Sequence, residues 1–461
     1  MKIIERDLVV LGGGPGGYTA AFRAADLGRK VTLVEKEAVL GGVCLNMGCI
    51  PSKTLLHYAE VIDEVAKIAP LGLLYNEPTF DLEKIRDHKT EVIKKLNNGL
   101  AALAKARNVE IIEGYGTLKS SNELVVGEST IQFKELIIST GSRPAQIPGT
   151  PYDDERVWDS TEALLLKEIP QHLAIIGGGI IGLEMAAIYH ALGSKITIIE
   201  MADSIIPAAD KDLKAPLIKA IKGQYEAIHT KTKVERVEAT KEALILHLDN
   251  ETQIEADALL VAVGRKPNSD SIGLETTNVE VDSRGFIIVN EEFRTNVKNI
   301  YAIGDVTGDP MLAHRAAHQG KVAAEVACGE KSAFTPLGIP SVAYTHPEIA
   351  WVGLTETEAK ERGIEYVKGS FPWQASSRAM SALSDSGVTK ALFDKESKRL
   401  IGAGITGKNA GELISEALLA LEMGAVSEDI ALSIHAHPTL SETLAIAAEL
   451  VEKRATDTLN R

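Results

Sequence analysis

The segment LVVLGGGPGG at residues 8–17 decides the fold of this 461-residue chain, and a close copy, LAIIGGGIIG, occupies residues 173–182. In each copy, a short apolar run precedes glycines and then an alanine-rich stretch of helical character. Each stretch ends near a glycine and leads into a β-rich segment, at residues 31–35 and 196–200. Apolar runs of strand length that alternate with helical patterns indicate strand–helix–strand units. The sequence therefore predicts an α/β protein that contains two such units.

The glycines of both copies have the spacing of a dinucleotide-binding turn, and an acidic residue follows at the end of the next strand. Such glycines allow a tight turn and a close approach of the backbone to a pyrophosphate at the helix N-terminus. The acid accepts a hydrogen bond from a ribose hydroxyl. Alternatively, the glycines only allow close helix–strand packing around a vacant turn. The residues are Gly12, Gly14, Gly17 and Glu35 in the first Rossmann-like unit, and Gly177, Gly179, Gly182 and Glu200 in the second.

Glu200 favours NAD over NADP in the second unit. A carboxylate at this position repels a 2′-phosphate, and the next residues, Met201 and Ala202, offer no arginine to receive one. We therefore expect the second unit to bind NAD as a mobile hydride carrier.

Cys44 and Cys49 lie close together in GGVCLNMGCIPSK, residues 41–53. The chain has only 3 cysteines, and a bridge across so short a loop contributes little stability. The pair suits thiol–disulfide exchange, which needs an attacking thiolate and a second, resolving thiol. The alternatives are two buried apolar side chains or half of a zinc site, but no second cluster completes a zinc shell and no metal site is predicted. Cys328, in an alanine-rich helix, is expected to be a core thiol.

A flavin is expected to connect these two chemistries. A nicotinamide transfers hydride as an electron pair and does not readily reduce a disulfide directly, whereas FAD can exchange electrons with both. Because the cysteines follow soon after Glu35, the first unit is expected to bind FAD.

Changes in composition predict the domain limits. Residues 143–154, which contain proline and glycine, are typical of a linker, and residues 264–268 mark an exit from the second unit. Towards the C-terminus, short strands precede helices at about 412–423 and about 439–453, a pattern typical of an α+β domain. We expect an FAD-binding domain at residues 1–150 and 271–335, an NAD-binding domain at 151–270, and a C-terminal α+β domain at 336–461.

Residues 41–53 resemble the redox-active disulfide motif of the pyridine nucleotide–disulfide oxidoreductases. The similarity covers essentially the whole chain, including STG at residues 139–141, IGD at 303–305 and HAHPTLSE at 435–442. It is closest to the members that oxidise dihydrolipoyl groups. The resemblance implies a homodimer in which the C-terminal domain forms the interface and both subunits contribute to each active site.

The resemblance also implies roles for individual residues. Cys44 exchanges with the substrate, and Cys49 forms the charge-transfer thiolate beside the flavin. Lys53 approaches the flavin and pairs with Glu184, and Asp305 holds the ribityl chain. From local sequence alone, Lys53 could be a solvated lysine, Glu184 a partner of a helix dipole and Asp305 a turn former. Besides Cys44 and Lys53, further expected FAD contacts are Lys36, Gly42, Val43 (threonine in many relatives), Gly116, Thr140, Gly141, Ser142, Met311, Leu312, Ala313 and His314; besides Glu184, further NAD contacts are Ile180, Ile181, Val234 and Gly264.

A dithiol must lose protons before it attacks a disulfide, so the site needs a base that titrates near neutrality. The resemblance implies that His437 is this base and that Glu442 orients it, both acting in the site of the other subunit. Two alternatives stay open from the residues alone. Glu442 could complete a capping box that begins at Thr439, and His435 could titrate in place of His437 or be structural.

The net charge of −15 argues against nucleic acid and anionic membranes as partners and favours a basic partner surface. We expect no signal peptide or membrane span, and scarce cysteine is typical of the cytoplasm. The resemblance implies oxidation of dihydrolipoyl groups with reduction of NAD. The carrier would be the acyltransferase subunit of a 2-oxo acid dehydrogenase complex or the glycine cleavage carrier protein. Rival functions are reduction of glutathione or coenzyme A disulfide, mercuric reduction, and a non-catalytic redox sensor.

Overall fold

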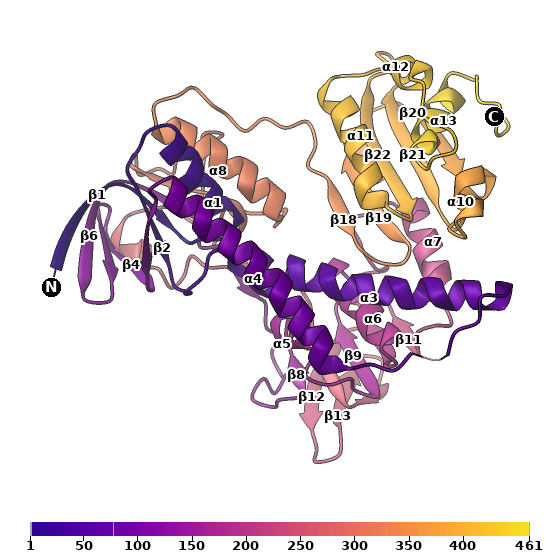
Figure 1. Ribbon diagram of the computed structural model, residues 1–461, viewed down its shortest axis with the longest axis horizontal. Coiled ribbons are helices and arrows are strands. Elements are labelled where there is room, and N and C mark those ends of the chain that lie inside the picture. Colours follow the sequence, from indigo (N-terminus) through magenta and orange to yellow (C-terminus); the bar gives the residue numbers. More distant parts are fainter. Residues whose placement is uncertain (1, 77, 461) are drawn as a thin grey trace. The chain divides into compact units, whose positions relative to one another are not determined.

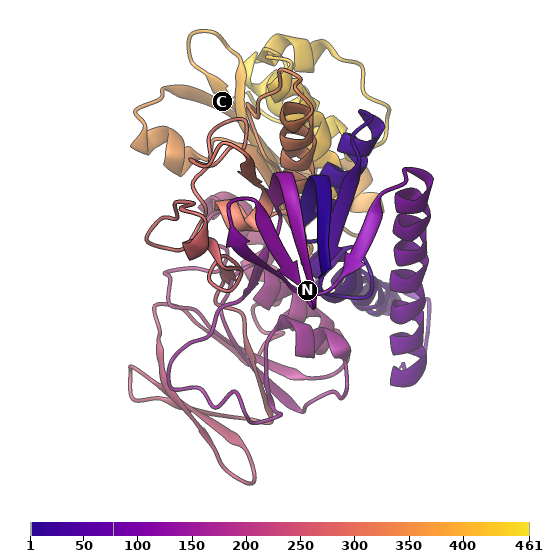
Figure 2. The same ribbon diagram turned by 90° about the vertical axis from the view of Figure 1, so that its left-hand side faces the viewer.

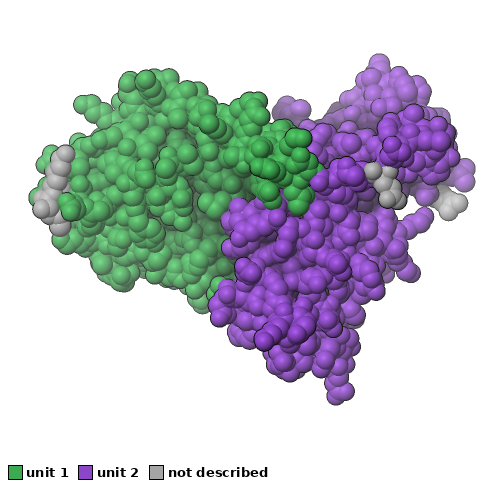
Figure 3. Space-filling view, turned by 60° about the horizontal axis from the view of Figure 1, so that its bottom comes forward, with its two compact units in different colours: residues 1–54, 81–146, 264–335 green, residues 55–80, 147–263, 336–461 purple. Residues whose placement is uncertain are grey.

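The structure is a computed structural model that describes residues 2–76 and 78–460. The chain divides into two compact units, which Figure 3 distinguishes by colour. Each unit is assembled from segments that are far apart in the sequence. The first unit contains residues 1–54, 81–146 and 264–335, and the second contains residues 55–80, 147–263 and 336–461.

A largely parallel sheet forms the centre of the first unit (Figure 2). Its strand order is β3-β2-β1-β6-β5-β4, and β17 also pairs with β6. The pairs that involve β1, β2, β3 and β17 are parallel, whereas β4, β5 and β6 pair antiparallel among themselves. Parallel strands are buried on both faces, which explains the unbroken apolar run at residues 8–11. The strands are β1 (Lys2–Leu11), β2 (Val31–Glu35), β3 (Glu110–Glu113), β4 (Gly116–Ser120), β5 (Glu123–Val126), β6 (Ser129–Ile138) and β17 (Ile300–Ala302), with β7 (Ser142–Pro144) paired to β16 (Arg265–Pro267) nearby in the same unit.

Helices α1 (Pro15–Asp26) and α8 (Ala313–Ala327) pack closely in the first unit because both present small residues. A Cβ on Gly320 of α8 would lie 2.5 Å from the carbonyl oxygen of Gly16 in α1, so this approach requires glycine. Buried alanines of both helices join the core that covers the sheet. Cys328 follows α8 directly and packs, half-buried, at the edge of this core. The remaining helices are α2 (Gly42–Met47), α4 (Leu82–Ala106) and α3 (Cys49–Ile68), which begins in this unit and continues into the second.

The second unit repeats the strand–helix–strand arrangement in a fully parallel sheet of order β11-β10-β9-β15-β8. Helix α6 (Ile180–Ala191) follows β9 as α1 follows β1. An antiparallel sheet of order β12-β13-β14 shares a hydrophobic core with it. The bounds are β8 (Val157–Trp158), α5 (Ser160–Leu165), β9 (His172–Ile176), β10 (Lys195–Ile199), α7 (Lys211–Ile221), β11 (Ala227–His229), β12 (Val234–Ala239), β13 (Leu244–Leu248), β14 (Gln253–Ala256) and β15 (Ala258–Val261).

The C-terminal part of the second unit is an antiparallel sheet of order β18-β19-β22-β21-β20 against which helices α11 and α13 pack (Figure 1). The predicted α/β class with a C-terminal α+β part is confirmed. Helix α13 begins at Glu442, later than the predicted 439. Among the helices described, none is long and apolar enough to cross a membrane. The bounds are β18 (Ser341–Ala343), β19 (Glu348–Gly353), α9 (Glu356–Glu361), β20 (Tyr366–Pro372), α10 (Ser377–Ser381), β21 (Val388–Asp394), β22 (Leu400–Gly407), α11 (Ala410–Glu422), α12 (Ser427–Leu432) and α13 (Glu442–Val451).

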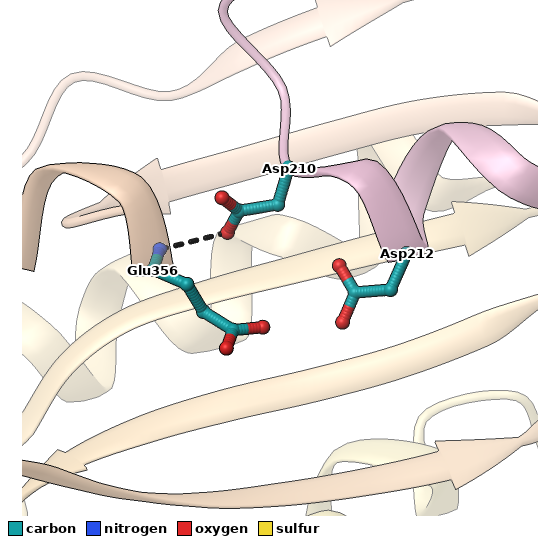
Figure 4. Close-up of side chains that lie close together, drawn as sticks. All are labelled: Asp210, Asp212 and Glu356. Carbon is teal, nitrogen blue, oxygen red and sulfur yellow. Dashed lines mark hydrogen bonds between the residues drawn. The ribbon is translucent and has the colours of Figure 1, made fainter. Parts of the chain in front are cut away.

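Lys390 of β21 is a buried cation in the second unit, with a side chain only 2% exposed. Its Nζ lies 2.7 Å from Asp210 Oδ2, 2.6 Å from Asp212 Oδ1 and 3.0 Å from Glu356 Oε1. Figure 4 shows these three carboxylates, with the backbone N–H of Glu356 donating to Asp210. Burial alone would raise the pKa of Glu356, but hydrogen bonds from two lysines and a tyrosine outweigh it and hold that pKa at about 2. The carboxylates are close enough to share a cation, and Lys390 supplies that positive charge.

Replacement of Lys390 by methionine is expected to destabilise the protein by about 3 kcal/mol, because three carboxylates lose their buried cation. The control Lys395→Met removes an exposed ion pair and should cost less than about 1 kcal/mol. The pKa values of Asp210 and Glu356 are lower in the folded protein than in the unfolded chain, where they lie near 4. The ion-pair network therefore stabilises the fold at pH values above about 4, and this stabilisation is lost as the pH falls towards 2. Urea midpoints should therefore differ at neutral pH and converge in acid. Equal midpoints for both variants at neutral pH would contradict this role.

Candidate active site

The first and third glycines of each turn are required by the packing of the protein itself. Gly12 and Gly177 have φ values of +105° and +113°, a region that other residues rarely adopt. A Cβ on Gly17 would lie 1.8 Å from the carbonyl oxygen of Gly12, and one on Gly182 would lie 2.0 Å from that of Gly177. The two copies are therefore alike in structure as well as in sequence.

The middle glycine of each turn is not explained by packing. No atom lies within 4 Å of a Cβ placed on Gly179, and the nearest to one on Gly14 is 3.9 Å away. Both residues directly precede a helix, whose first N–H groups and dipole favour an anion. Open space at the N-terminus of a helix fits a phosphate group that approaches the backbone. Both turns thus have the form needed to hold the pyrophosphate of a dinucleotide.

The acidic residue of each unit supports its own glycine turn. Glu35 Oε2 accepts a hydrogen bond from the backbone N–H of Gly13 at 2.5 Å, and Glu200 Oε2 accepts one from Gly178 at 2.7 Å. The second oxygen of each carboxylate accepts from the backbone N–H two residues further on. The acids therefore hold the turn in place, a function that the sequence analysis did not anticipate. Their carboxylate oxygens keep further lone pairs for a ribose hydroxyl.

The cysteine segment, residues 41–53, is attached directly to the first glycine turn. Gly41 donates a backbone hydrogen bond to Gly13 O at 2.8 Å. Gly42, which opens α2, approaches so closely that a Cβ on it would lie 2.7 Å from Gly14 Cα. Cys44 lies in α2 and Cys49 is the first residue of α3. This backbone contact sets the cysteines beside the turn expected to bind FAD.

Cys44 and Cys49 are reduced in the structure, and their thiols are hydrogen-bonded to each other. The hydrogen bond with Cys49, followed by burial, raises the pKa of the Cys44 thiol. Lys53 lies one turn after Cys49 in α3, and its positive charge acts in the opposite direction on Cys44. The N-terminus of α3 favours negative charge on Cys49. Cys49 at the start of α3 is therefore placed where a negative charge would be stabilised.

Asp305 lies in a hydrogen-bonded group that joins three distant segments of the first unit. Ser142 Oγ donates to Asp305 Oδ2 at 2.6 Å, and Arg265 Nε donates to Ser142 Oγ at 2.7 Å. Gln319, which is 1% exposed, accepts from the backbone N–H of Gly304 at 2.7 Å. Arg265 and Gln319 were missed in the sequence, although Arg265 lies in the segment 264–268 that was interpreted only as an exit.

The other predicted contact residues have varied surroundings. Gly116 is explained by packing, because a Cβ there would lie 2.6 Å from Leu11 Cδ1. Val234 is a core residue at the start of β12. Glu184 is buried and accepts from the backbone N–H of Tyr344 at 3.3 Å. Thr140 and Gly141 are half-buried and precede β7. Met311 and Leu312 precede α8, which begins with Ala313 and His314, and Ile180 and Ile181 begin α6. The exposed members are Lys36, Val43 and Gly264.

His437 and Glu442 form a hydrogen-bonded pair in the C-terminal part of the second unit. His437 Nδ1 lies 2.9 Å from Glu442 Oε1, and the histidine side chain is 72% exposed. A carboxylate can only accept, so Nδ1 carries a proton and the neutral ring has its lone pair on Nε2. Burial tends to raise the pKa of Glu442, but hydrogen bonds from Thr439 and His437 and the charge of His435 together lower it. The arrangement suits a base with an ionised orienting group.

Glu442 also has the structural function that the sequence left open. Its Oε2 accepts from the backbone N–H of Thr439 at 2.7 Å. Thr439 Oγ1 donates to Ala436 O at 2.8 Å, so only one half of the capping box is present. The two interpretations of Glu442 are compatible, because each uses a different carboxylate oxygen.

His435 is engaged at both ring nitrogens. Its Nε2 lies 2.6 Å from Glu416 Oε1 and its Nδ1 lies 2.8 Å from Ser433 O, and the side chain is 11% exposed. No nitrogen is left to take up a proton from a substrate. The geometry therefore favours His437 over His435 as the base.

Residues 6–320 match the pyridine nucleotide–disulphide oxidoreductase family, and residues 339–448 match the dimerisation domain of that family. The chain belongs to the pyridine nucleotide–disulphide oxidoreductases, a family that uses FAD and NAD. A dihydrolipoyl dehydrogenase of Vibrio parahaemolyticus is 51% identical over 100% of this chain and 98% of its own length. One from Haemophilus influenzae is 50% identical over the same shares of both chains. The flavoprotein disulfide reductase RclA of Escherichia coli has a similar structure, with a TM-score of 0.87, 30% identity and coverage of 96% of this chain and 100% of its own.

A matched pair of alanine variants tests the glycine turn of the second unit. Gly179→Ala should leave the free energy of unfolding within about 1 kcal/mol, because the methyl group meets no atom. It should weaken NADH binding roughly tenfold, since the methyl occupies space needed by the pyrophosphate. Gly182→Ala should instead destabilise the fold, because its Cβ would meet Gly177 O at 2.0 Å. Thermal unfolding and NADH titration measure the two effects, and unchanged NADH affinity in Gly179→Ala would refute the assignment.

Proposed function

We propose that this chain acts as a dihydrolipoyl dehydrogenase. It oxidises protein-bound dihydrolipoyl groups and reduces NAD, by means of a Cys44–Cys49 disulfide and FAD. The observation that carries this proposal is the attachment of the cysteine segment to the first glycine turn through Gly41 and Gly42. Full-length relatives named dihydrolipoyl dehydrogenase support it.

The reaction begins with removal of a proton from the substrate dithiol by Nε2 of His437. The Nδ1–H group of His437 keeps its hydrogen bond to Glu442, and this carboxylate stabilises the imidazolium that forms on His437. The resulting substrate thiolate attacks Cys44 Sγ, the Cys44–Cys49 bond breaks, and Cys49 leaves as a thiolate. The N-terminus of α3 stabilises that negative charge.

The second substrate thiol completes the exchange. It attacks the substrate sulfur bound to Cys44, which closes the lipoyl disulfide and releases Cys44. His437 gives the proton it holds to Cys44 as that sulfur leaves and takes up the proton of the second thiol. The substrate loses two electrons and the cysteine pair gains them. The raised pKa of Cys44 favours its release as a thiol. FAD, when bound, supplies the two-electron relay between the reduced cysteines and NAD. Ser142 and Asp305 would hold FAD near the first turn, and Glu200 would select NAD at the second.

We further propose a homodimer, for which the match of residues 339–448 to a dimerisation domain is the support. In this assembly, His437 and Glu442 would act on the cysteines of the other subunit, and Lys53 would pair with Glu184. The domain limits are proposed as 1–150 with 271–335 for FAD, 151–270 for NAD and 336–461 for the interface.

The proposed partner is the lipoyl-bearing acyltransferase of a 2-oxo acid dehydrogenase complex or the glycine cleavage carrier protein, in the cytoplasm. A net charge of −15 favours a basic docking surface. Such docking would weaken as salt rises, and stronger docking at high salt would exclude it.

A substrate panel tests the proposed activity against its rivals. Dihydrolipoamide, glutathione disulfide and coenzyme A disulfide are each assayed with the NAD and NADP couples. Dihydrolipoamide with NAD should give the highest kcat/KM, because Glu200 opposes a 2′-phosphate. Faster NADPH-dependent turnover of either disulfide would replace the proposal with a reductase of that compound. Absence of turnover with every pair would indicate a redox sensor.

Substitution of the base should separate chemistry from folding. His437→Gln should lower kcat/KM for dihydrolipoamide by about 10²–10⁴-fold, the usual contribution of general base catalysis. Glu442→Gln keeps an oxygen that accepts from the backbone N–H of Thr439 but removes the negative charge beside His437. Its kcat/KM for dihydrolipoamide should therefore fall less than that of His437→Gln. NADH oxidation by an outer-sphere acceptor should be unchanged in both variants. Wild-type turnover of dihydrolipoamide by His437→Gln would refute the role of the base.

A further inference from the structure

His435 links helix α11 to the loop that carries His437. The loop comprises residues 433–441 between α12 and α13 (Figure 1). His435 Nε2 contacts Glu416 Oε1 of α11 at 2.6 Å, and its Nδ1 contacts Ser433 O at 2.8 Å. The loop is therefore fixed to the domain two residues before His437.

The partners of His435 determine its protonation state. Ser433 O can only accept a hydrogen bond, so Nδ1 must carry a proton. The carboxylate of Glu416 likewise requires a proton at Nε2, which makes the ring an imidazolium. Burial tends to lower the pKa of His435, but the hydrogen bonds and the charges of Glu416 and Glu442 outweigh it and raise that pKa. The groups that act on the ring are all acidic, namely Glu416 on α11 and Glu442 and Glu449 on α13.

His435 acts on the His437–Glu442 pair in two ways. Its hydrogen bonds restrain the backbone that leads into His437, in a loop without helix or strand. Its positive charge contributes to the lowered pKa of Glu442 and so keeps that carboxylate ionised as an acceptor for His437. Neither effect requires contact between His435 and a substrate.

We propose that His435 is a positioning residue whose imidazolium, paired with Glu416, holds the 433–441 loop against α11 and sets His437 on Glu442. This inference rests on the proposed function, because it concerns the base of that reaction. It assigns to the first histidine of the HAHPTLSE segment a function different from that of the second.

Three variants test the pair: His435→Gln, Glu416→Gln and the double variant. Each single change should lower kcat/KM for dihydrolipoamide about tenfold, the effect of one charge-assisted hydrogen bond. The loss should appear in kcat with little change in KM. The double variant should be no worse than either single variant, because both remove the same interaction. Flavin reduction by NADH should keep its wild-type rate, since it does not use His437. The control Glu428→Gln removes an exposed partner of Arg454 and should be neutral.

The pH dependence distinguishes a positioning cation from a structural side chain. The ratio of wild-type kcat/KM to that of His435→Gln should be greatest at neutral pH. It should shrink as the pH rises through the raised pKa of His435, because the wild-type imidazolium then loses its charge. His435→Lys should recover most of the activity at neutral pH. A deficit that is constant with pH, or no recovery in His435→Lys, would overturn the inference.

The outcomes also separate this inference from the proposed function. If the wild-type protein oxidises no dihydrolipoamide, the proposed function fails and the inference fails with it. If the wild type turns over normally and the variants match it, only the inference fails. Should His435→Gln not fold, Glu416→Gln remains a sufficient test, because its side chain is 41% exposed.

Discussion

The close contact between two glycine backbones, at Gly14 and Gly42, is the constraint on which the site depends. A side chain at Gly42 would separate α2, which carries Cys44, from the first glycine turn, because a Cβ on Gly42 would meet Gly14 Cα at 2.7 Å. The hydrogen bond from Gly41 to Gly13 maintains the contact. The cysteines are therefore placed by the main chain, whose position is less variable than that of any side chain.

The comparison between the two glycine turns explains how one motif supports two functions. Both turns share the positive φ of the first glycine, the packing of the third and the acid that holds the turn. The two turns differ around the middle glycine. Gly42, at the start of α2, lies close to Gly14, whereas no atom lies within 4 Å of a Cβ placed on Gly179. A site bordered by protein suits a resident cofactor, whereas an open one suits a coenzyme that must leave.

Local patterns predicted the fold well, and long-range contacts escaped prediction. The glycine spacing, the apolar strands and the cysteine pair are each read within a short window, and they led to the correct fold class. Arg265 and Gln319 approach Ser142 and Gly304 only after folding, so no local signal marks them. The start of α13 was placed at 439 instead of 442, because the capping-box pattern does not reveal that Thr439 Oγ1 bonds to Ala436 instead.

Lys390 contacts the three carboxylates that Figure 4 shows and so joins separate segments of the second unit. Lys390 belongs to the C-terminal sheet, whereas Asp210 and Asp212 lie at the start of α7, which packs on that sheet and lies between β10 and β11 in the chain. Movement of α7 away from the C-terminal sheet would break these bonds, so local opening around α7 is coupled to that sheet. A coenzyme that binds only the closed form would then also stabilise the C-terminal sheet. Occupancy by nucleotide and integrity of the subunit contact surface thereby become thermodynamically linked.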